Sequence, residues 1–411
     1  MKKRLLVLGA GTAGTMIVNK LRHRLSPAEW SITVVDRDDV HPYQPGYLFL
    51  PFGMLAPEQI TRSRHTFLPD GVDFVIADVD RVDGPASTVT LTDGRTLDYD
   101  YLVIASGTTP RPDQTPGMLG DEWQRSIFDF YTFEGAKALS AALKSFDHGR
   151  LVVHITDMPI KCPVAPLEFT FLAEAWLRGK GLRDRVEMVY VTPLPGAFTK
   201  PIASERLGSM LDERKIAVEA DFLVEHIDQE SKTLVSYDER QVPFDLLITI
   251  PLNMGADFIA RSGLGDELNY VPVDKGTLRS TTYDNIFAVG DASDIPASKA
   301  GSVAHFSVEI FVDNFLQLIA GKPMTGSFDG RGGPAHARRA ASCSRAAGGR
   351  RPPRRAVPAR AAAPSCRGSR HERRCRARCR RRPRRGRAPA RSPDTRPSGA
   401  NRPRTRAGSA G

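Results

Sequence analysis

Cysteine is almost absent from the first 330 residues of this 411-residue chain, where Cys162 stands alone. One cysteine cannot form an intramolecular disulfide, so a disulfide-stapled fold is excluded for this part, and a free thiol suits a reducing cytoplasm. The chain also has no run of 18 apolar residues, so no transmembrane helix is expected. The apolar residues that follow Met1 lead directly into a glycine turn, which indicates a first strand and not a cleavable signal.

The C-terminal part lacks a different set of residues. Residues 331–411 contain no Leu, Ile, Met, Phe, Tyr or Trp and a single Val, so they cannot bury enough apolar surface to offset the entropy of ordering. We therefore expect a disordered tail. Of the 58 basic residues in the chain, 26 are arginines of this tail, which holds only two acids, so the tail carries +24 and the first 330 residues carry −13. The net charge of +11 indicates nothing about the partners of the folded part.

The composition of the tail admits three interpretations. An arginine-rich arm can bind polyanions by counterion release, but it has no aromatic residues to stack on bases, so no specific nucleic acid is expected. Its cysteines and His371 lack a paired CxxC spacing, so no metal site is expected. The sharp change of composition favours an out-of-frame translation of GC-rich DNA from about residue 331. The four tail cysteines are Cys343, Cys366, Cys375 and Cys379.

The chain is organised around an apolar strand that leads into residues 9–14, GAGTAG, and then a helix. Gly9 permits a tight turn, Gly11 lets a pyrophosphate approach the backbone, and Gly14 lets the helix pack on the strand. Free N–H groups at the start of the helix would face the phosphates. A second strand ends in Asp36, whose carboxylate can accept hydrogen bonds from ribose hydroxyls. The pattern predicts a dinucleotide site; the alternative is a glycine-rich turn without a ligand.

Two later stretches point to the same site. A strand at residues 101–104 ends in small residues, which let a ligand or another segment lie close to the backbone. Residues 285–292 repeat the order of strand, glycine and acid, and would complete the first site if this strand returns to the first sheet. A helix predicted over 301–319 would aim its positive N-terminal end at the ring, and such an end stabilises negative charge by up to about 2 kcal/mol. This favours FAD.

The predicted cofactor site also includes a proline- and glycine-punctuated turn at residues 41–47, which could touch the reactive ring or be an ordinary loop. The expected cofactor-binding residues are Gly9, Gly11, Thr12, Ala13, Gly14, Asp36, Gln44, Ala105, Ser106, Gly107, Gly290, Asp291, Lys299 and Gly301.

A second doubly wound unit is expected to open with a strand at residues 151–156. In place of its glycine loop stand residues 158–168, MPIKCPVAPLE, which contain three prolines. Proline lacks an N–H group and fixes φ, so this turn is poorly suited to hold a pyrophosphate, and a second dinucleotide is not expected. Further elements are predicted as helices over 133–146, 169–177 and 204–214 and as strands over 186–191 and 244–251.

The expected fold is α/β, with two Rossmann-like dinucleotide-binding domains. The FAD-binding domain would consist of residues 1–110 and 251–330, with the second domain, residues 111–250, inserted between them, and residues 331–411 would form the tail.

These dispersed stretches together resemble the flavoproteins with two dinucleotide-binding domains, the superfamily of the disulfide reductases. Within it, residues 160–168, 198–201 and 298–306 resemble the sulfide:quinone oxidoreductases, and the likeness runs from about residue 3 to 330. In that family FAD takes electrons from sulfide at a cysteine pair on one face of the ring and passes them to a quinone on the other. The resemblance implies FAD as cofactor, sulfide and quinone as substrates, and a membrane surface as a peripheral partner of a cytoplasmic protein. It leaves a homo-oligomer open.

By resemblance, Cys162 would carry sulfur as a persulfide, Glu168 would handle protons near the sulfur, and Lys299 would lie by the flavin or quinone. The residues alone agree in part, because a thiol in a proline-rich loop is a reasonable nucleophile and Lys161 beside it would lower its pKa. The alternatives are a small buried apolar residue for Cys162, a solvated helix start for Glu168 and a plain surface lysine for Lys299.

The chain departs from the family after residues 327–330, SFDG. Family members continue there with a second cysteine and with apolar stretches that close the quinone pocket and dock on the membrane, and no tail cysteine stands in a matching context. We therefore expect FAD binding and partial reduction by sulfide. The rivals are an NAD(P)H:quinone dehydrogenase, which needs the missing second glycine loop, a dithiol disulfide reductase, which needs a cysteine pair, and a non-catalytic flavin-binding protein.

Overall fold

The structure is a computed structural model that describes residues 1–328. The expectations for the tail lie outside the described residues. They concern its disorder, its out-of-frame origin and its four cysteines.

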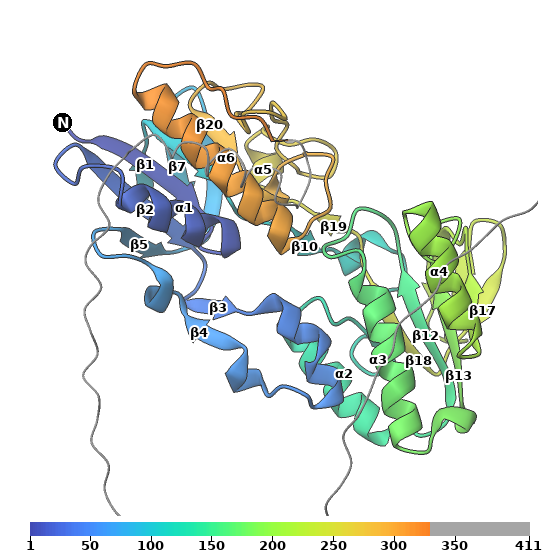
Figure 1. The fold of residues 1–411 in the computed structure, drawn as a ribbon. Coiled ribbons are helices and arrows are strands. Elements are labelled where there is room, and N and C mark those ends of the chain that lie inside the picture. The colour runs from blue at the N-terminus through green and yellow to red at the C-terminus, as the bar shows by residue number, and fades with distance from the viewer. Residues whose placement is uncertain (329–411) are drawn as a thin grey trace, which may run out of the picture. The chain divides into compact units, whose positions relative to one another are not determined.

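The first sheet holds the dinucleotide loop and is entirely parallel, in the order β20-β9-β1-β2-β5 (Figure 1). β1 (Lys3–Leu8) lies between β2 (Trp30–Asp36) and β9 (Tyr101–Ile104), and the outer strands are β5 (Asp73–Ile76) and β20 (Ile286–Ala288). The inner strands are near-continuous apolar runs, typical of a parallel sheet covered on both faces. The predicted return of the last strand to this sheet is confirmed, because β20 pairs with β9.

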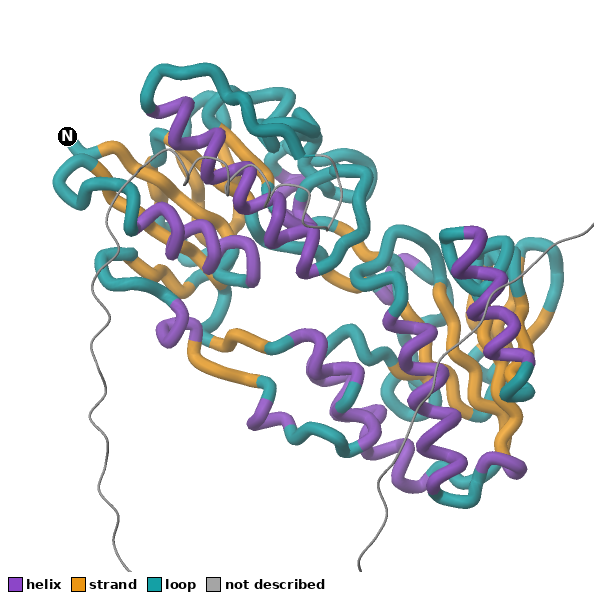
Figure 2. Tube along the Cα trace, in the orientation of Figure 1, coloured by secondary structure: helices purple, strands orange, loops and turns teal. Residues whose placement is uncertain are grey.

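Two helices pack together on the first sheet, α1 (Thr12–Arg22) and α6 (Gly301–Ile319), and Figure 2 shows them side by side along its strands. α6 has the bounds that its apolar spacing predicts. Its buried stripe includes Phe311 and Phe315, which stack with ring centroids 5.6 Å apart, and Phe315 also meets Trp30 of β2. The stripe is core packing, as expected. Three antiparallel strands, β6 (Val79–Asp83), β7 (Thr88–Leu91) and β8 (Thr96–Asp98), and the short helix α5 (Asp257–Arg261) complete this part.

The second sheet is also parallel, in the order β11-β18-β12-β13-β14. Its strands are β11 (Ile127–Phe128), β12 (Gly149–Ile155), β13 (Val186–Val191), β14 (Ile216–Glu219) and β18 (Leu246–Ile250). The fold is therefore α/β with two Rossmann-like units, as the sequence predicts. A small antiparallel sheet follows β14, built from β15 (Val224–Asp228), β16 (Thr233–Ser236) and β17 (Gln241–Pro243).

The helices of the second unit are α2 (Phe133–Ser145), α3 (Ala165–Gly179) and α4 (Pro201–Asp212). α3 and α4 begin three to four residues before their predicted starts. In both, a proline occupies the first turn, where its missing N–H group costs nothing because that group has no partner within the helix. The apolar spacing used for the prediction begins only after these prolines. The earlier start of α3 places Glu168 within its first turn.

The chain crosses between the two units through a pair of antiparallel segments, β10 (Thr109–Pro110) and β19 (Asn253–Met254). The proposed domain limits at residues 110 and 250 stay a prediction.

Residues 43–60 belong to the first unit by sequence but pack in the core of the second. They run between β3 (Val40–Pro42) and its antiparallel partner β4 (Thr61–Ser63), and Phe52 meets Phe169 with ring centroids 5.1 Å apart. The expected proline- and glycine-punctuated turn at 41–47 is the end of β3 followed by a short 3-10 helix, Gln44–Leu48. Gly46 allows this close packing, because a Cβ there would lie 2.5 Å from the side chain of Ile60.

Candidate functional site

The glycine loop has the geometry of a phosphate cradle. Gly9 has φ +105°, and a Cβ on Gly14 would lie 1.8 Å from the carbonyl oxygen of Gly9, so helix α1 approaches the loop as closely as its backbone allows. A Cβ on Gly11 would meet nothing within 4 Å, so that position faces open space. Helix α1 has no side-chain cap at Gly11, which leaves N–H groups of its first turn free for an anion.

The ends of β9 and β20 reach the same loop. A Cβ on Gly9 would lie 2.5 Å from the carbonyl oxygen of Ala105, and a Cβ on Gly290 would lie 3.2 Å from the Cβ of Ala13. The buried hydroxyl of Ser106 has no hydrogen-bond partner within residues 1–328. An open glycine, free N–H groups and an orphaned hydroxyl fit the phosphates of a dinucleotide.

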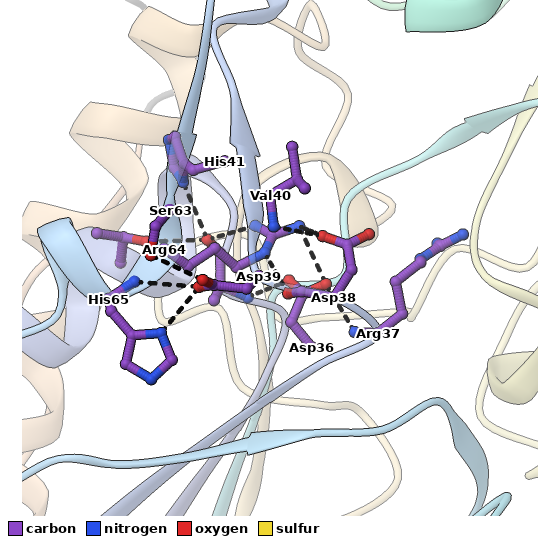
Figure 3. Close-up of polar contacts among 11 residues, drawn as sticks. Asp36, Arg37, Asp38, Asp39, Val40, His41, Ser63, Arg64 and His65 are labelled. Atoms are coloured by element: carbon purple, nitrogen blue, oxygen red, sulfur yellow. Dashed lines mark hydrogen bonds and ion pairs between the residues drawn. The ribbon is translucent and has the colours of Figure 1, made fainter.

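Asp36 lies at the end of β2 beside the loop, but protein groups already bind both of its carboxylate oxygens. The N–H groups of Ala10 and Arg37 donate at 2.7 and 2.8 Å, and the guanidinium of Arg64 lies 3.1 Å away (Figure 3). Arg64 also donates to the carbonyl oxygens of Ala10 and Asp38, at 2.8 and 2.9 Å. Sequence reasoning missed Arg64, which begins the 3-10 turn that follows β4. No sequence motif links this turn to the end of β2.

Cys162 lies in the loop between β12 and α3 with an exposed thiol, so the buried-residue alternative is wrong. Its N–H donates to the carbonyl oxygen of Lys299 at 2.7 Å, and its own carbonyl accepts from the Tyr131 hydroxyl at 3.1 Å and from the Ala165 N–H at 2.8 Å. Partial withdrawal of the thiol from water raises its pKa, and the negative charge of Glu168 raises this pKa further. The structure therefore brings Cys162, Glu168 and the Lys299 segment together.

Lys161 does not act on the thiol in the expected way. Its ammonium lies 3.4 Å from the side-chain oxygen of Gln44, its N–H donates to Asn253 at 3.0 Å, and the pKa of Cys162 is raised. The expectation that Lys161 lowers that pKa is wrong. Burial lowers the pKa of Lys161 itself, while the negative charge of Asp291 favours its charged form. Gln44 thus lies beside the cysteine loop.

Lys299 is buried, so the surface-lysine alternative is wrong. Its ammonium donates to the carbonyl oxygen of Ser293 at 2.8 Å and lies 3.7 Å from the centre of the Tyr270 ring. Burial lowers the pKa of Lys299 to about 8, and Asp291 opposes this shift. Burial also raises the pKa of Asp291, which the charges of Lys299 and Lys161 counteract. Lys299 lies two residues before Gly301, where α6 begins without a side-chain cap.

The loop after β12 has few N–H groups to offer a second pyrophosphate. Prolines contribute none, and five of the N–H groups donate to protein acceptors. The donors are Thr156, Met158, Lys161, Cys162 and Ala165, and the acceptors are Ile250, Asp157, Asn253, Lys299 and Cys162. This arrangement supports the expectation that the second unit holds no dinucleotide here.

Comparisons with known proteins bear on the whole described chain. Residues 3–154 match the family model of the pyridine nucleotide-disulphide oxidoreductases. The mitochondrial sulfide:quinone oxidoreductase of Dictyostelium discoideum is 27% identical over 333 residues, which cover 80% of this chain and 73% of that protein. The type II NADH:quinone oxidoreductase of Staphylococcus aureus is 34% identical, but over 125 residues that cover 30% of this chain and 31% of that protein.

The crystal structure of the sulfide:quinone oxidoreductase from Aquifex aeolicus has the same fold, with a TM-score of 0.69, 21% identity and coverage of 78% of each chain. Among residues 1–328, no helix is both long enough and apolar enough to cross a membrane. The relatives extend across both units, and the cysteine loop lies against the segment that leads into α6. The chain is an oxidoreductase, and over 72–80% of its length it is similar to the sulfide:quinone oxidoreductases.

Proposed function

We propose that this chain binds FAD, oxidises sulfide at Cys162 and delivers the electrons to a quinone. One observation carries the proposal: the exposed thiol of Cys162 is tied, through a 2.7 Å backbone hydrogen bond to Lys299, to the segment that enters α6 beside the dinucleotide loop. This contact supports a role for the Cys162 sulfur beside the groups that would hold a redox cofactor. The names of the relatives supply sulfide and the quinone as substrates.

The dinucleotide cradle would hold FAD through residues of both segments of the first unit. The loop and the start of α1 would bind the pyrophosphate, Asp36 would accept from a ribose hydroxyl, and the start of α6 would face the ring. Bound FAD would supply the two-electron oxidant for sulfide and reduce the quinone. The proposed contacts come from Gly9, Gly11, Thr12, Ala13, Gly14, Asp36, Gln44, Ala105, Ser106, Gly107, Gly290, Asp291, Lys299 and Gly301.

Cys162 would form the sulfur–sulfur bond. Joining its thiol to hydrogen sulfide gives a persulfide and releases two electrons and two protons. The carboxylate of Glu168, close enough to raise the thiol pKa, would accept a proton from the incoming sulfur. The buried ammonium of Lys299 would favour negative charge in its surroundings.

A nicotinamide:quinone dehydrogenase is the nearest rival, because a relative with that activity shares part of the chain. That activity needs a site for a second dinucleotide. The N–H groups of the loop after β12 are largely engaged with protein acceptors, which disfavours it. Contact with a membrane surface also belongs to the proposal, although the sequence after residue 330 has none of the apolar stretches that dock the family on a membrane.

Anaerobic reduction of the purified holoprotein tests the proposal. We expect sulfide to bleach the visible flavin absorption of the unmodified chain, Cys162→Ala to abolish the response, and a soluble quinone to restore the colour. NADH should have no comparable effect. Bleaching by NADH alone would establish the nicotinamide activity instead, and no bleaching by either reductant would leave a flavin-binding protein without this chemistry.

A further inference from the structure

Cys162 has a backbone conformation that is unfavourable for residues with a Cβ atom. Its φ is +43°, in the left-handed region where the Cβ of a residue other than glycine crowds its own backbone. The residue adopts it in a loop that also exposes its thiol. A non-glycine residue persists in this region only where its surroundings over-determine the conformation. The contacts of the Cys162 peptide groups therefore decide how this loop presents the sulfur.

The carbonyl of Cys162 is held by a side chain from outside the loop. The Tyr131 hydroxyl donates to it at 3.1 Å, and the Ala165 N–H donates from the first turn of α3. Tyr131 comes from the segment between β11 and α2, far from the loop in sequence. The N–H of Cys162 is fixed separately, by the carbonyl of Lys299. Both peptide groups that define φ and ψ of Cys162 are thus anchored to distant parts of the chain.

Tyr131 is itself rigidly placed. Its side chain is buried, its ring meets Phe130 edge-on at 5.1 Å, and its N–H donates to the buried carboxylate of Asp129 at 2.8 Å. Asp129 also accepts from Thr132, which caps helix α2. Burial raises the pKa of Tyr131 well above its ordinary value, so the hydroxyl stays protonated and remains a donor at neutral pH.

We propose that Tyr131 is a positioning residue that holds Cys162 in the left-handed conformation and thereby keeps the thiol presented to the cofactor side. The catalytic consequence of this proposal rests on the proposed function. The claim that Tyr131 holds the backbone of Cys162 rests on the contacts alone. Tyr131 acts through the carbonyl of Cys162 and takes no part in proton transfer.

A cycle of holoprotein variants tests the conformational part without sulfide. In a left-handed position glycine is unstrained and alanine is not, so Cys162→Gly should melt at a higher temperature than Cys162→Ala. In the Tyr131→Phe background the loop is free to relax, and the alanine variant should then melt at the same or a higher temperature than the glycine variant. Tyr190→Phe is the control, because it removes another buried tyrosine hydroxyl that has no partner within residues 1–328. The advantage of glycine should persist in that background.

Rapid mixing with sulfide tests the catalytic part. Tyr131→Phe should lower the limiting rate of flavin reduction about fivefold, the effect of one neutral hydrogen bond, with the pH midpoint and the FAD affinity unchanged. Tyr190→Phe should react like the unmodified protein.

An advantage of glycine that survives Tyr131→Phe would overturn the conformational proposal. A shift of the pH midpoint of flavin reduction in Tyr131→Phe would overturn the positioning role too, because it would assign Tyr131 a role in proton transfer. An unchanged reduction rate would reduce Tyr131 to a structural residue. Failure of sulfide to reduce even the unmodified protein would refute the proposed function, and the melting cycle would still decide the role of Tyr131.

Discussion

Gly290 and Ala13 come from opposite ends of the described chain, yet a Cβ on Gly290 would lie only 3.2 Å from the Cβ of Ala13. Gly290 has φ +73° and follows β20, the last strand to join the first sheet. The dinucleotide loop is therefore complete only when the chain has returned from the second unit. Cofactor binding should report the folding of both units, because the first unit forms the cradle and the second unit lies in sequence between its two halves.

Two glycines of the loop should respond differently to alanine. At Gly14 the added Cβ would lie 1.8 Å from a backbone oxygen, so we expect Gly14→Ala to lose at least about 3 kcal/mol of stability. At Gly11 the Cβ meets nothing within 4 Å, so Gly11→Ala should cost no more than about 1 kcal/mol while weakening FAD binding, since the Cβ fills ligand space. Urea unfolding and flavin fluorescence titration measure the two effects. Equal losses of stability would contradict this assignment.

Arg64→Leu should destabilise the protein by about 3 kcal/mol and weaken FAD binding. It removes the partner of the Asp36 carboxylate, whose side chain is 13% exposed, and breaking a buried ion pair leaves an uncompensated charge. Arg62→Leu is the matched control and should have little effect, because Arg62 is exposed and its hydrogen bonds within residues 1–328 go to backbone carbonyls. Adding Asp36→Asn to Arg64→Leu should recover part of the loss in urea unfolding. No recovery would show that Arg64 acts mainly through the carbonyl of Ala10.

The reactivity of Cys162 should rise with pH, because its raised pKa leaves little thiolate at neutral pH. Glu168→Gln removes a negative neighbour, so it should lower the pH midpoint of alkylation and increase the rate at pH 7. Iodoacetamide labelling, followed on the Cys162 peptide by mass spectrometry, separates this thiol from the other four. Glu213→Gln, at the amino ends of the second sheet's strands, is the control and should leave the midpoint unchanged. A midpoint that Glu168→Gln does not lower would contradict the charge effect.

His154 should make the protein less stable in mild acid. It is fully buried in β12, and burial lowers its pKa to about 3. The unfolded chain binds the proton near pH 6.5, so the contribution of this group is complete above that pH and falls as the pH drops toward 3. Between pH 7 and pH 5 the loss should be about 2 kcal/mol. Urea unfolding at both values, compared with His154→Gln, isolates the effect; an equal loss in the variant would contradict it.

The sequence predicted those parts whose causes are local. The glycine spacing of residues 9–14, the acid at the end of β2 and the apolar spacing of α6 each follow from the geometry of one turn or one helix face. The bounds of α6 were therefore predicted correctly. The starts of α3 and α4 were predicted late, because the apolar pattern does not extend to the prolines of their first turns.

The missed residues act across long sequence distances. Arg64 meets Asp36, and Tyr131 meets the carbonyl of Cys162, only after separate strands have assembled. Neither residue type is unusual for its position, so no local pattern marks them. Lys161 was assigned a role from its adjacency to Cys162, but neighbours in an extended loop point in different directions, and its ammonium is turned toward Gln44.

The packing of residues 43–60 into the second core limits how this protein can be recombined with its relatives. Tyr47, Leu50 and Phe52 share an apolar cluster with side chains of β11, β12 and α3. A chimera that exchanges only residues 111–250 would set these three side chains against a core that did not evolve with them. Exchanging residues 43–60 together with the second unit should preserve the packing of these side chains. The segments that must be exchanged together are therefore separate in sequence, although they share one core.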